Sequence, residues 1–370
     1  MQKKVVFFIP TLEAGGAEKN AVNILSHLNR EKYKIKLVVC KKRGEFLKNA
    51  PSDIPIVEIG SSNSLYFFFL MLNFLKKDDS DFFVSNLTRF NLINLLAGSL
   101  ISKRKKFVIV EHAPLSLLPK TAKSLWHKFI ASLFLRFLMK FLYPRAHRII
   151  AVSKGVAEEL NIILRGRADV KVIYNPVASN NILKLSKEPV SHPFFNDKNI
   201  PIIIAVGRLT KAKDYMTLLK ALKILRYQKN VRLIVIGKGE EDRALKKFAS
   251  DSGIGEFVDF LGFRENPFKY MAKSDIFVNS SVREGFGNSI VEAMCLGIPV
   301  VATMCSGPKE ILGEDGILVK VGDSKALSEA IGSLLDNQSL SSSLSQKLIQ
   351  RANDFSINKS VEKYEAIFND

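Results

Sequence analysis

The sequence predicts an α/β protein made of two doubly wound domains in tandem. Strand-like and helix-like segments alternate along nearly all of the 370 residues. The strand-like segments are almost continuously apolar, and the alternation lapses once, near the middle of the chain. Near-continuous apolar strands are typical of parallel sheets that helices cover on both faces. With 47% apolar residues, the chain is long enough for two such domains.

Six strand-like segments are expected in the first half, with helical patterns between them. The strands are expected at 5–9, 35–39, 82–85, 107–111, 148–152 and 170–174, and the helices near 17–28, 65–76, 91–101, 121–142 and 154–163. Residues 175–201 then break the pattern, because they are polar and include four prolines. We expect this segment to link domains of residues 1–180 and 181–352.

The alternation restarts after the linker. Strands are expected at 201–206, 231–237, 257–262, 275–279, 299–303 and 317–321, and helices near 214–228, 240–251, 266–273, 288–296, 323–336, 339–352 and 358–368. In open parallel sheets, ligands bind outside the carboxyl ends of the strands. Two such domains facing each other would therefore enclose a cleft in which a ligand binds.

Composition argues against several classes of protein. The three cysteines are too scattered for a disulfide framework or a zinc site, which is consistent with a reducing cytoplasm. The apolar run 5–10 is too short for a signal peptide and is expected to be the first strand. The apolar segments 65–75 and 129–143 fall short of the ~20 residues that span a bilayer. We therefore expect no transmembrane helix.

The net charge of +19 is unevenly distributed. Residues 1–190 hold 31 Lys and Arg against 14 Asp and Glu, whereas residues 191–370 hold 24 against 22. A basic half indicates an anionic partner, such as nucleic acid, anionic lipid or a phosphorylated substrate, unless the charge only keeps the protein soluble. No nucleic-acid recognition motif accompanies the charge, so nucleic acid is not expected as a partner.

The stretch SVREGFGNSIVEAMCLGIPVVAT (281–303) comes directly after a strand and contains two glutamates eight residues apart. Glu284 is expected in the loop beyond the strand, and Gly285 and Gly287 leave the backbone open to a ligand. Asn288 is expected to be the N-cap of the next helix, with Ser289 at its first position. A helix start of this kind favours a phosphate group.

Glu292 is expected a turn into that helix, pointing outward as an acceptor for hydroxyl groups. Two carboxylates that flank an anion site repel it unless a hydroxyl-rich ligand is bound there. The alternative is a tight strand-to-helix connection with solvated glutamates. We favour a site for a sugar, a diphosphate and a ribose.

Two further turns come after predicted strands. In AVGRLTKAKD (205–214), Gly207 ends a strand, and Arg208 and Lys213 follow it, which indicates a diphosphate clamp in place of ordinary surface cations. In TLEAGGAEK (11–19), Gly15 and Gly16 precede a helix and form either a phosphate-binding turn or a turn without a ligand. The run IGKGEE (236–241) is only G-x-G, so a nicotinamide site is poorly supported.

Glu111 and His112 in VIVEHAP (108–114) lie at the carboxyl end of a strand, where His112 is either a substrate-binding or proton-carrying residue or a structural histidine. The acidic triplet 79–81 precedes a strand and is interpreted as a polar turn, so no metal site is expected. The segment 120–148 is long, apolar and basic, and indicates either an interfacial helix on an anionic membrane or a core helix with a basic outer face.

These motifs resemble the family 4 retaining glycosyltransferases of the GT-B fold, in which two Rossmann-like doubly wound domains face a cleft. The resemblance to the donor domain covers residues 201–320 and is carried by GRLTKAKD (207–214), GFRENPFKYMAKSDIFVNSS (262–281) and the E-x7-E motif of REGFGNSIVEAMCLGIPVVAT (283–303). It extends weakly through 8–19, 110–114 and 152–155. It is closest to bacterial enzymes that extend lipid-linked glycans.

The resemblance implies roles for individual residues of this chain. His112, Glu284, Arg208 and Lys213 would be catalytic, with the two cations on the donor diphosphate, Glu284 on the donor sugar and His112 at the reaction centre. Donor-binding residues would be Gly15, Gly16, Gly207, Phe263, Arg264, Gly285, Phe286, Gly287, Asn288, Ser289 and Glu292. Among these, Phe263 or Arg264 would line the base, and Glu292 would bind the ribose. Residues 353–370 would form a helix that crosses back to the first domain.

The expected function is retaining transfer of a sugar, with UDP-N-acetylhexosamine as the favoured donor, to a membrane-linked glycan. The first domain would bind the acceptor and face an anionic membrane, peripherally and on the cytoplasmic side, and the second would bind the donor. The resemblance implies that no metal is required, because members of the family need none, and the D-x-D triplet of residues 79–81 precedes a strand and is interpreted as a polar turn. No cofactor is expected, because the nucleotide sugar is a substrate. The alternatives are a GT-B sugar-nucleotide epimerase, which needs no acceptor, and a non-catalytic glycan- or lipid-binding scaffold.

Overall fold

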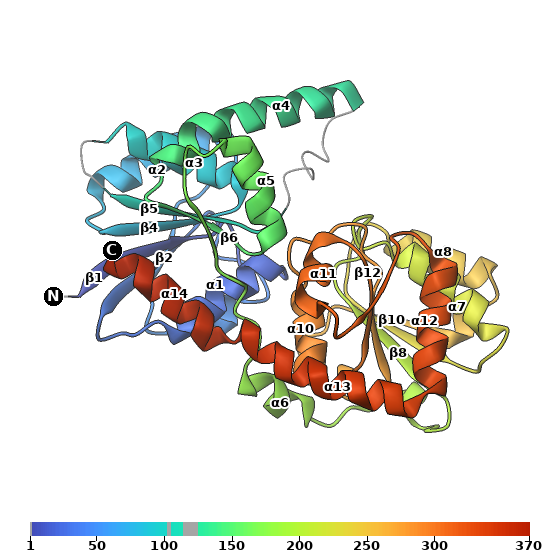
Figure 1. Ribbon diagram of the computed structural model, residues 1–370. Coiled ribbons are helices and arrows are strands. Elements are labelled where there is room, and N and C mark those ends of the chain that lie inside the picture. Colours follow the sequence, from blue (N-terminus) through green and yellow to red (C-terminus); the bar gives the residue numbers. More distant parts are fainter. Residues whose placement is uncertain (1, 102–104, 114–124) are drawn as a thin grey trace. The chain divides into compact units, whose positions relative to one another are not determined.

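The protein consists of two compact units, which are drawn in Figure 1. The computed structural model describes residues 2–101, 105–113 and 125–370, and the side chains of these residues except 125–132. Unit 1 runs to Pro176 and also contains Ile357–Asp370, whereas unit 2 is Val177–Ser356. The chain therefore enters unit 2 at Val177 and returns to unit 1 at Ile357.

Among its described residues, unit 1 contains a seven-stranded parallel sheet with the order β3-β2-β1-β4-β5-β6-β7. Its strands are β1 (Lys3–Phe8), β2 (Tyr33–Val39), β3 (Ile56–Glu58), β4 (Phe82–Asn86), β5 (Lys106–Glu111), β6 (Arg148–Ala151) and β7 (Val170–Val172). Its helices are α1 (Gly16–His27), α2 (Ser64–Lys77), α3 (Thr88–Ser99), α4 (Leu125–Leu142), α5 (Lys154–Leu164) and α14 (Ile357–Asn369), with short 3-10 turns at Leu47–Asn49 and Tyr143–Arg145.

The strand order places the helices of unit 1 in two layers. The chain moves from β1 to β2 in one direction along the sheet and from β3 through β7 in the other. Because parallel crossovers are right-handed, this reversal puts α1 on one face of the sheet and α2, α3, α4 and α5 on the opposite face. Figure 1 shows the same arrangement, with α14 beside α1.

Helix α14 is held to unit 1 by aromatic packing. The buried ring of Phe368 lies 5.2 Å from Phe82, 5.5 Å from Tyr33 and 6.3 Å from Phe7, centroid to centroid. The Lys3 ammonium also donates to the Phe368 carbonyl oxygen at 2.7 Å. The last helix is therefore part of the core of unit 1, although it comes after unit 2 in the chain.

Unit 2, which is described throughout, contains a six-stranded parallel sheet with the order β10-β9-β8-β11-β12-β13. Its strands are β8 (Ile202–Val206), β9 (Arg232–Ile236), β10 (Val258–Gly262), β11 (Ile276–Asn279), β12 (Val300–Thr303) and β13 (Ile317–Val319). Its helices are α6 (Asn180–Ser186), α7 (Tyr215–Arg226), α8 (Asp242–Asp251), α9 (Phe268–Met271), α10 (Asn288–Cys295), α11 (Ser306–Leu312), α12 (Ser324–Asp336) and α13 (Gln338–Ala352), with 3-10 turns at Pro193–Phe195, Gly255–Phe257 and Asn353–Phe355.

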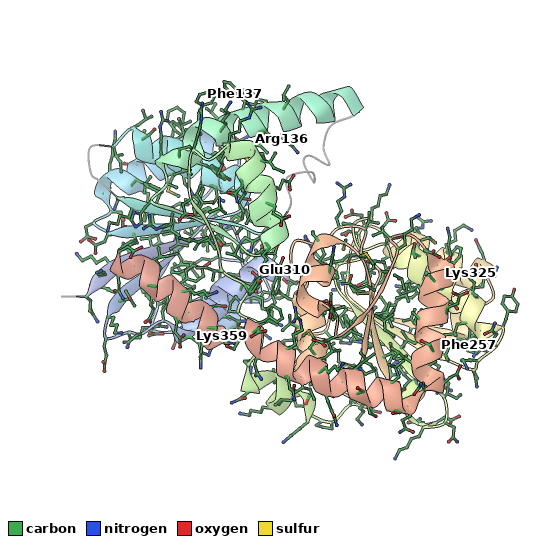
Figure 2. The ribbon with its side chains drawn as sticks, in the orientation of Figure 1. Arg136, Phe137, Phe257, Glu310, Lys325 and Lys359 are labelled. Atoms are coloured by element: carbon green, nitrogen blue, oxygen red, sulfur yellow. The ribbon has the colours of Figure 1, made fainter. Side chains whose placement is uncertain are left out.

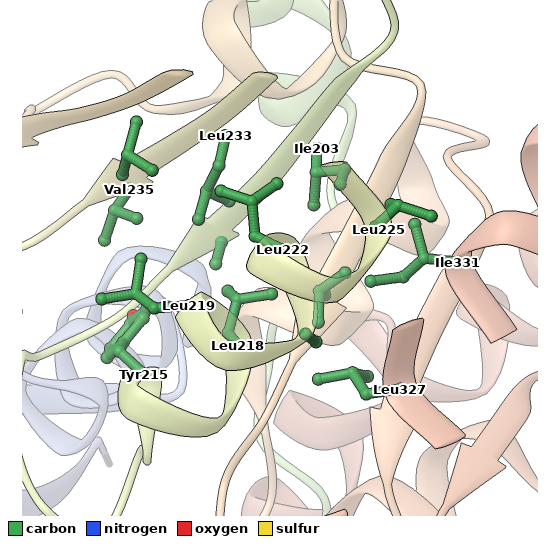
Figure 3. Packing of buried hydrophobic residues seen from close by; sticks show 14 of the residues in the cluster. Ile203, Tyr215, Leu218, Leu219, Leu222, Leu225, Leu233, Val235, Leu327 and Ile331 are labelled. Atoms are coloured by element: carbon green, nitrogen blue, oxygen red, sulfur yellow. The ribbon is translucent and has the colours of Figure 1, made fainter. Parts of the chain in front are cut away.

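The core of unit 2 forms where α7 and α12 pack on one face of this sheet (Figure 3). Leu218, Leu222 and Leu225 recur at helical spacing on α7 and are at most 1% exposed. They meet Leu233 of β9 and Ile331 of α12. This apolar layer fixes the start of α7, and hence the loop between β8 and α7.

Three expectations about secondary structure need correction. Helix α11 was not expected, because it has only seven residues and its first turn contains Gly307 and Pro308. Residues 175–201, expected to be a linker, contain the helix α6, which packs against α9 within unit 2. The edge strand β3 was not expected, because it is only three residues long and only partly buried.

Candidate active site

The candidate site of unit 2 lies where the strand order of its sheet reverses. The chain leaves β8 for β9 and β10 on one side, and then returns to place β11 against the other side of β8. Two loops, 207–214 and 280–287, leave the carboxyl ends of these neighbouring strands at this switch point. Open α/β sheets bind ligands at such a point, because the connections from the two neighbouring strands run in opposite directions along the sheet.

Lys213 and Glu284 meet at this switch point. The Lys213 ammonium donates to the Glu284 carboxylate, and the two side chains are 21% and 16% exposed. The two loops are also joined through Ala212, whose carbonyl oxygen accepts from Val282 N at 2.9 Å, and through Lys213, whose carbonyl oxygen accepts from Ser280 Oγ at 2.9 Å. The backbone contacts hold a cation and a carboxylate in place at the edge of the sheet. Arg208 lies in the same loop as Lys213. Its side chain is exposed and forms no ion pair within the described part of the chain.

Two glycines directly after β9 allow its loop to press against the loop after β8. A Cβ atom on Gly237 would lie 1.9 Å from the Gly207 carbonyl oxygen, and one on Gly239 would lie 2.1 Å from the Leu209 carbonyl oxygen. Leu209 N also donates to the Lys238 carbonyl oxygen at 2.9 Å. The G-x-G of residues 237–239 is thus explained by the close approach of two backbones that shape the Arg208 loop.

The start of α10 differs by one residue from the expectation. Gly287 is the N-cap, with φ at 120°, and Asn288 is the first helical residue, so the prediction of Asn288 as N-cap was wrong. A left-handed φ of this size favours glycine, which explains the residue at this turn. Ser289 is at the second helical position, and the buried Gly285 lies between Glu284 and the N-cap. The first backbone N–H groups of a helix have no acceptor in a preceding turn and point out of its end.

Two side chains near α10 are more buried than a binding role would suggest. The ring of Phe286 is 2% exposed and packs at 5.4 Å on Phe355, so only its backbone is available to a ligand. Glu292 is 4% exposed, so the expectation that it points outward was wrong. It is the fifth residue of α10, a helix packed against α13 and α6. Burial and the Glu292 carboxylate raise the pKa of Cys295 to about 12.

The remaining candidates of unit 2 come after β10. Phe263 is half-buried and Arg264 is exposed, directly after Gly262 at the end of that strand. Since β10 lies two strands from β8, these residues are on the same edge of the sheet as Arg208.

In unit 1, Gly15 and Gly16 are at the start of α1, the helix after β1. Gly15 is the N-cap, and a Cβ atom there would lie 2.1 Å from Glu18 Oε2. A carboxylate therefore folds back over the helix start, where an anion would otherwise bind. The loop before α1 packs against the turn formed by Arg43 and the glycine that follows it, because Leu12 N donates to the Arg43 carbonyl oxygen at 2.9 Å.

His112 lies directly after β5 and is oriented by Asn86 at the end of β4. The Asn86 amide donates to the Phe8 carbonyl oxygen at 3.0 Å, so its Oδ1 accepts from His112 Nε2 at 2.9 Å. With the proton on Nε2, the buried Nδ1 is an acceptor, and it has no partner among the residues that the structure describes. Burial lowers the pKa of His112 to about 4, so the ring is neutral at physiological pH.

The residue before this histidine is the centre of a buried network. The Glu111 carboxylate accepts from Thr88 Oγ1 at 2.5 Å, from Asn91 Nδ2 at 2.7 Å and from the Tyr143 hydroxyl. Burial raises the pKa of Glu111. The network ties the carboxyl end of β5 to α3 and to the turn after α4, so it fixes the backbone from which His112 extends.

Comparison with known families agrees with this geometry. Residues 14–180 match the model described as Glycosyltransferase Family 4, and residues 187–354 match the model described as Glycosyl transferases group 1. The chain is 30% identical to the N-acetylgalactosamine-N,N'-diacetylbacillosaminyl-diphospho-undecaprenol 4-alpha-N-acetylgalactosaminyltransferase of Campylobacter jejuni, over 95% of this chain and 96% of that protein. The chain belongs to the family 4 glycosyltransferases.

Two further likenesses place this glycosyltransferase among its relatives. A second Campylobacter jejuni protein, the GalNAc-alpha-(1->4)-GalNAc-alpha-(1->3)-diNAcBac-PP-undecaprenol alpha-1,4-N-acetyl-D-galactosaminyltransferase, is 25% identical over 98% of this chain and 97% of its own. The fold matches the crystal structure of Anabaena HepE in complex with UDP and glucose, with a TM-score of 0.80, 21% identity and full coverage of both chains. The two sheets thus form the two Rossmann-like halves of the GT-B architecture.

Neither a metal cluster nor a membrane span is found in the described part of this glycosyltransferase. The described residues contain no group of three or more His, Cys, Asp or Glu side chains that could hold a metal ion. None of the helices within the described ranges is long and apolar enough to span a bilayer. In the acidic triplet 79–81, Asp79 pairs with the Lys4 ammonium and Asp81 accepts from Lys4 N at 2.7 Å.

The residues that support the site were not expected from the sequence. Asn86, which orients His112, was not singled out, although it ends a strand beside β1 at the switch point of unit 1. Ser280 and Ser281 were also missed: Ser281 Oγ donates to Glu284 Oε2 at 3.4 Å. Small polar residues at the end of a buried strand, or directly after it, are the signal that could have identified all three.

Proposed function

We propose that this glycosyltransferase moves a sugar from a UDP-sugar, with UDP-N-acetylhexosamine favoured, to a membrane-linked glycan, with retention at the anomeric carbon. The acceptor class places it in the assembly of bacterial surface polysaccharide, lipopolysaccharide or protein-linked glycan. The observation that carries the proposal is the Lys213–Glu284 pair at the switch point of unit 2, with Arg208 beside it in the same loop and the start of α10 directly after it.

The cations of this site would stabilise the leaving group. As the glycosidic bond breaks, the departing UDP gains negative charge on its terminal phosphate. Arg208, Lys213 and the N–H groups at the start of α10 supply positive charge that is already in place, which is the arrangement that lowers the barrier most effectively. These groups give the site its charge stabilisation without requiring a metal ion, and no cofactor is needed.

Glu284 would have two partners during the reaction. Without donor, its carboxylate holds the Lys213 ammonium in the site. With donor bound, the ammonium would contact the diphosphate and the carboxylate would accept hydrogen bonds from sugar hydroxyls. The uridine would lie along the ends of β9 and β10, towards Phe263 and Arg264, and Glu292 would bind the ribose if α10 or its neighbours shift to expose it.

Retention would result if attack and departure occur on one face of the sugar. The acceptor hydroxyl would attack the anomeric carbon on the side from which UDP leaves, and the departing phosphate oxygen would take the hydroxyl proton. The neutral His112, with Nδ1 as acceptor, would hold a hydroxyl of the donor sugar. Gly15 and Gly16 would contact the donor phosphate or the acceptor.

The proposal for donor and acceptor is supported by the named relatives. HepE was crystallised with UDP and glucose, which supports UDP as the carrier. Both Campylobacter relatives are named as N-acetylgalactosaminyltransferases acting on undecaprenol-linked saccharides, which supports an N-acetylhexosamine and a lipid-linked acceptor. Such an acceptor would require the enzyme to work as a peripheral protein at the cytoplasmic face of the membrane.

The test is release of UDP or GDP from a panel of sugar nucleotides, with and without an undecaprenyl-diphosphate-linked glycan in detergent. Release that depends on the acceptor, with an α-linked product by NMR and no loss of rate in EDTA, is the expected result. Conversion of the sugar nucleotide to its epimer without acceptor would instead establish the epimerase. Nucleotide binding without any turnover on the panel would favour the non-catalytic scaffold.

A further inference from the structure

The two helix layers of unit 1 differ sharply in what they expose. Ten large apolar side chains of unit 1 are exposed among the described residues, and all ten lie on or directly after α2, α3, α4 and α5. They are Leu65, Tyr66, Phe69, Leu96, Leu100, Leu133, Phe134, Phe137, Phe141 and Ile162. In the described chain, α1 and α14, which cover the other face of the sheet, have none. We call the ten residues the apolar face.

The apolar face is continuous because the helices that form it are neighbours. Helix α3 packs against α2 on one side and α4 on the other, and α4 packs against α5. On α4, Phe134, Phe137 and Phe141 recur at helical spacing and are 61%, 56% and 48% exposed, while Met139 and Leu142 are buried beneath them. Helix α4 is thus apolar on both its inner and its outer side, which is unusual for a helix that faces water.

The charges of the apolar face are mostly positive, because α2, α3, α4 and α5 together carry seven Lys and Arg residues and two Glu residues, both on α5. The sequences of α2, α3 and α4 contain six Lys and Arg residues and no Asp or Glu. Lys76 and Lys77 are exposed at the C-terminal end of α2. On α4, Arg136 lies between the exposed phenylalanines in sequence, and its guanidinium is 3.5 Å from the Glu159 carboxylate of α5. Figure 2 labels Phe137 on the outer side of α4 and Arg136 on the side towards α5. At the far end, the Arg167 guanidinium lies 5.7 Å from the Phe141 ring centroid.

We propose that the apolar face docks on an anionic lipid bilayer, with α2, α3 and α4 lying together at the interface. Exposed aromatic rings and leucines would enter the boundary between headgroups and acyl chains, while the cations meet lipid phosphates. The sequence indicated contact with an anionic membrane through the basic first half of the chain, with residues 120–148 as a candidate interfacial helix. The structure adds the exposed apolar side chains of α2 and α3, which makes the proposed contact a broad surface. This inference rests on the proposed lipid-linked acceptor, which it would bring to unit 1.

Charge complementarity favours a membrane over a second copy of the chain. Two copies meeting through this face would bring an excess of cations together, because its four helices carry seven Lys and Arg against Glu158 and Glu159 of α5, and Glu159 already pairs with Arg136 of its own chain. An anionic bilayer instead offers lipid phosphates to the cations and an apolar interior to the aromatic rings.

Vesicle flotation of the full chain tests the inference. The probes are vesicles of phosphatidylcholine with phosphatidylglycerol in equal parts, and vesicles of phosphatidylcholine alone. We expect binding to the anionic vesicles, weakened by high salt, and little binding to the neutral ones. Phe134→Ser with Phe137→Ser should lower the partition coefficient by roughly tenfold for each ring removed. Both residues are already exposed, so the change should not unfold unit 1.

Matched control variants distinguish binding through the apolar face from nonspecific hydrophobic binding to vesicles. Tyr227→Ser with Ile349→Ser removes two comparably exposed apolar side chains from unit 2 and should leave flotation unchanged. On α2, Phe69→Ser should weaken flotation as well, which residues 120–148 acting alone would not predict. Equal flotation of the α4 variant and wild type would overturn the inference, as would a dimer that the α4 variant dissociates.

Transfer rates measured on soluble and on vesicle-embedded acceptor test the docking surface separately from the proposed function. The α4 variant should transfer sugar to a short-chain, water-soluble acceptor at the wild-type rate, and should be slow only on acceptor embedded in anionic vesicles. If wild type turns over the soluble acceptor but does not float, the docking surface is wrong and the function stands. If it floats and turns over no acceptor, the function is wrong and the surface stands.

Discussion

The two units repeat one topology and differ in the loops at the carboxyl ends of their strands. In both sheets the first strand is flanked by the second and by the strand that comes after the reversal, so both have a switch point at the carboxyl edge. In unit 2 this point holds Lys213 against Glu284, with an exposed Arg208 nearby. In unit 1 it holds a neutral His112 bonded to Asn86, and a helix start covered by Glu18.

The comparison shows that buried strands and helices determine the fold, whereas short loops determine the chemistry. The loops of unit 2 carry a cation paired with a carboxylate at the switch point, whereas those of unit 1 hold a neutral histidine there and a carboxylate over the helix start. The outer surfaces differ in the same way, because unit 1 has a basic helix layer with the apolar face and unit 2 carries nearly balanced charge. One architecture thus carries the proposed donor site in unit 2 and the proposed docking surface in unit 1.

Removing Lys213, the cation at the switch point of unit 2, should have the largest effect on activity. Lys213→Ala is expected to lower kcat/KM for sugar transfer by roughly a hundredfold or more, comparable to losing one strong transition-state donor. The matched control is Lys211→Ala, which removes an exposed lysine from the same loop and should keep near-wild-type activity. A Lys213→Ala enzyme as fast as wild type would show that the charged switch point of unit 2 is not the donor site.

A glycine substitution tests whether the close loops of unit 2 are needed. Gly237→Ala places a Cβ atom 1.9 Å from the Gly207 carbonyl oxygen, so the two loops must separate. We expect a loss of about 2–3 kcal/mol in the free energy of unfolding of unit 2, with weaker UDP binding. Gly255→Ala is the control, because the nearest atom to its added Cβ is 3.6 Å away. Equal stability of both variants in urea unfolding would refute this explanation of the G-x-G.

A buried charge cluster should make unit 1 sensitive to acid. Burial alone would raise the pKa of Asp78, but hydrogen bonds from Lys105, Ser80 and Lys36 lower it to about 2. A lowered carboxyl pKa stabilises the fold above the unfolded value and loses that effect as the pH falls through the folded value. Asp78→Asn should therefore cost about 2 kcal/mol at pH 7, and the difference from wild type should shrink between about pH 4 and 2.

Hydrogen exchange of β4 and β5 amides would measure the stability of unit 1 alone. The adjacent Asp79→Asn is the control, because Asp79 is exposed and pairs only at the surface with Lys4, so little change is expected. A pH-independent cost of Asp78→Asn would contradict the account of the cluster.

The smallest expected effect concerns the neutral histidine of unit 1. Since burial lowers the pKa of His112 to about 4, its protonation is complete only well below that pH. The pH profile of kcat/KM should show no inflection from His112 between about pH 5.5 and 7.5. Nitrogen NMR of the ring should report a proton on Nε2 throughout that range. A titration of His112 centred near its usual value would contradict the acceptor role of Nδ1.

Much of the fold was predictable from the sequence because buried parallel strands leave an unmistakable apolar pattern. All the long strands were found, whereas β3 was missed because three half-buried residues leave almost no pattern. Helix α6 was missed because its surroundings are rich in proline and polar residues. Local composition identified the breaks between elements but did not reveal that a short helix packs there.

The candidate site was predictable in position and less so in detail. Loop positions are set by strand ends, so Lys213 and Glu284 were expected on one sheet edge, although their contact could not be derived from their separation of 71 residues. Glu292 lies on α10, which packs against α13 and α6 from distant parts of the chain, and periodicity within α10 does not show which elements cover it. The supporting contacts of Asn86 and Ser281 depend on side-chain geometry, which periodicity does not encode.

Hydrogen exchange with and without UDP tests the central claim most directly, because it needs no acceptor and no knowledge of the sugar. The account predicts that the strongest protection by UDP falls in residues 207–213 and 284–289 of unit 2, where the backbone and cations would hold the diphosphate. Protection confined to residues 11–18 of unit 1, or no protection in either segment at saturating UDP, would contradict it.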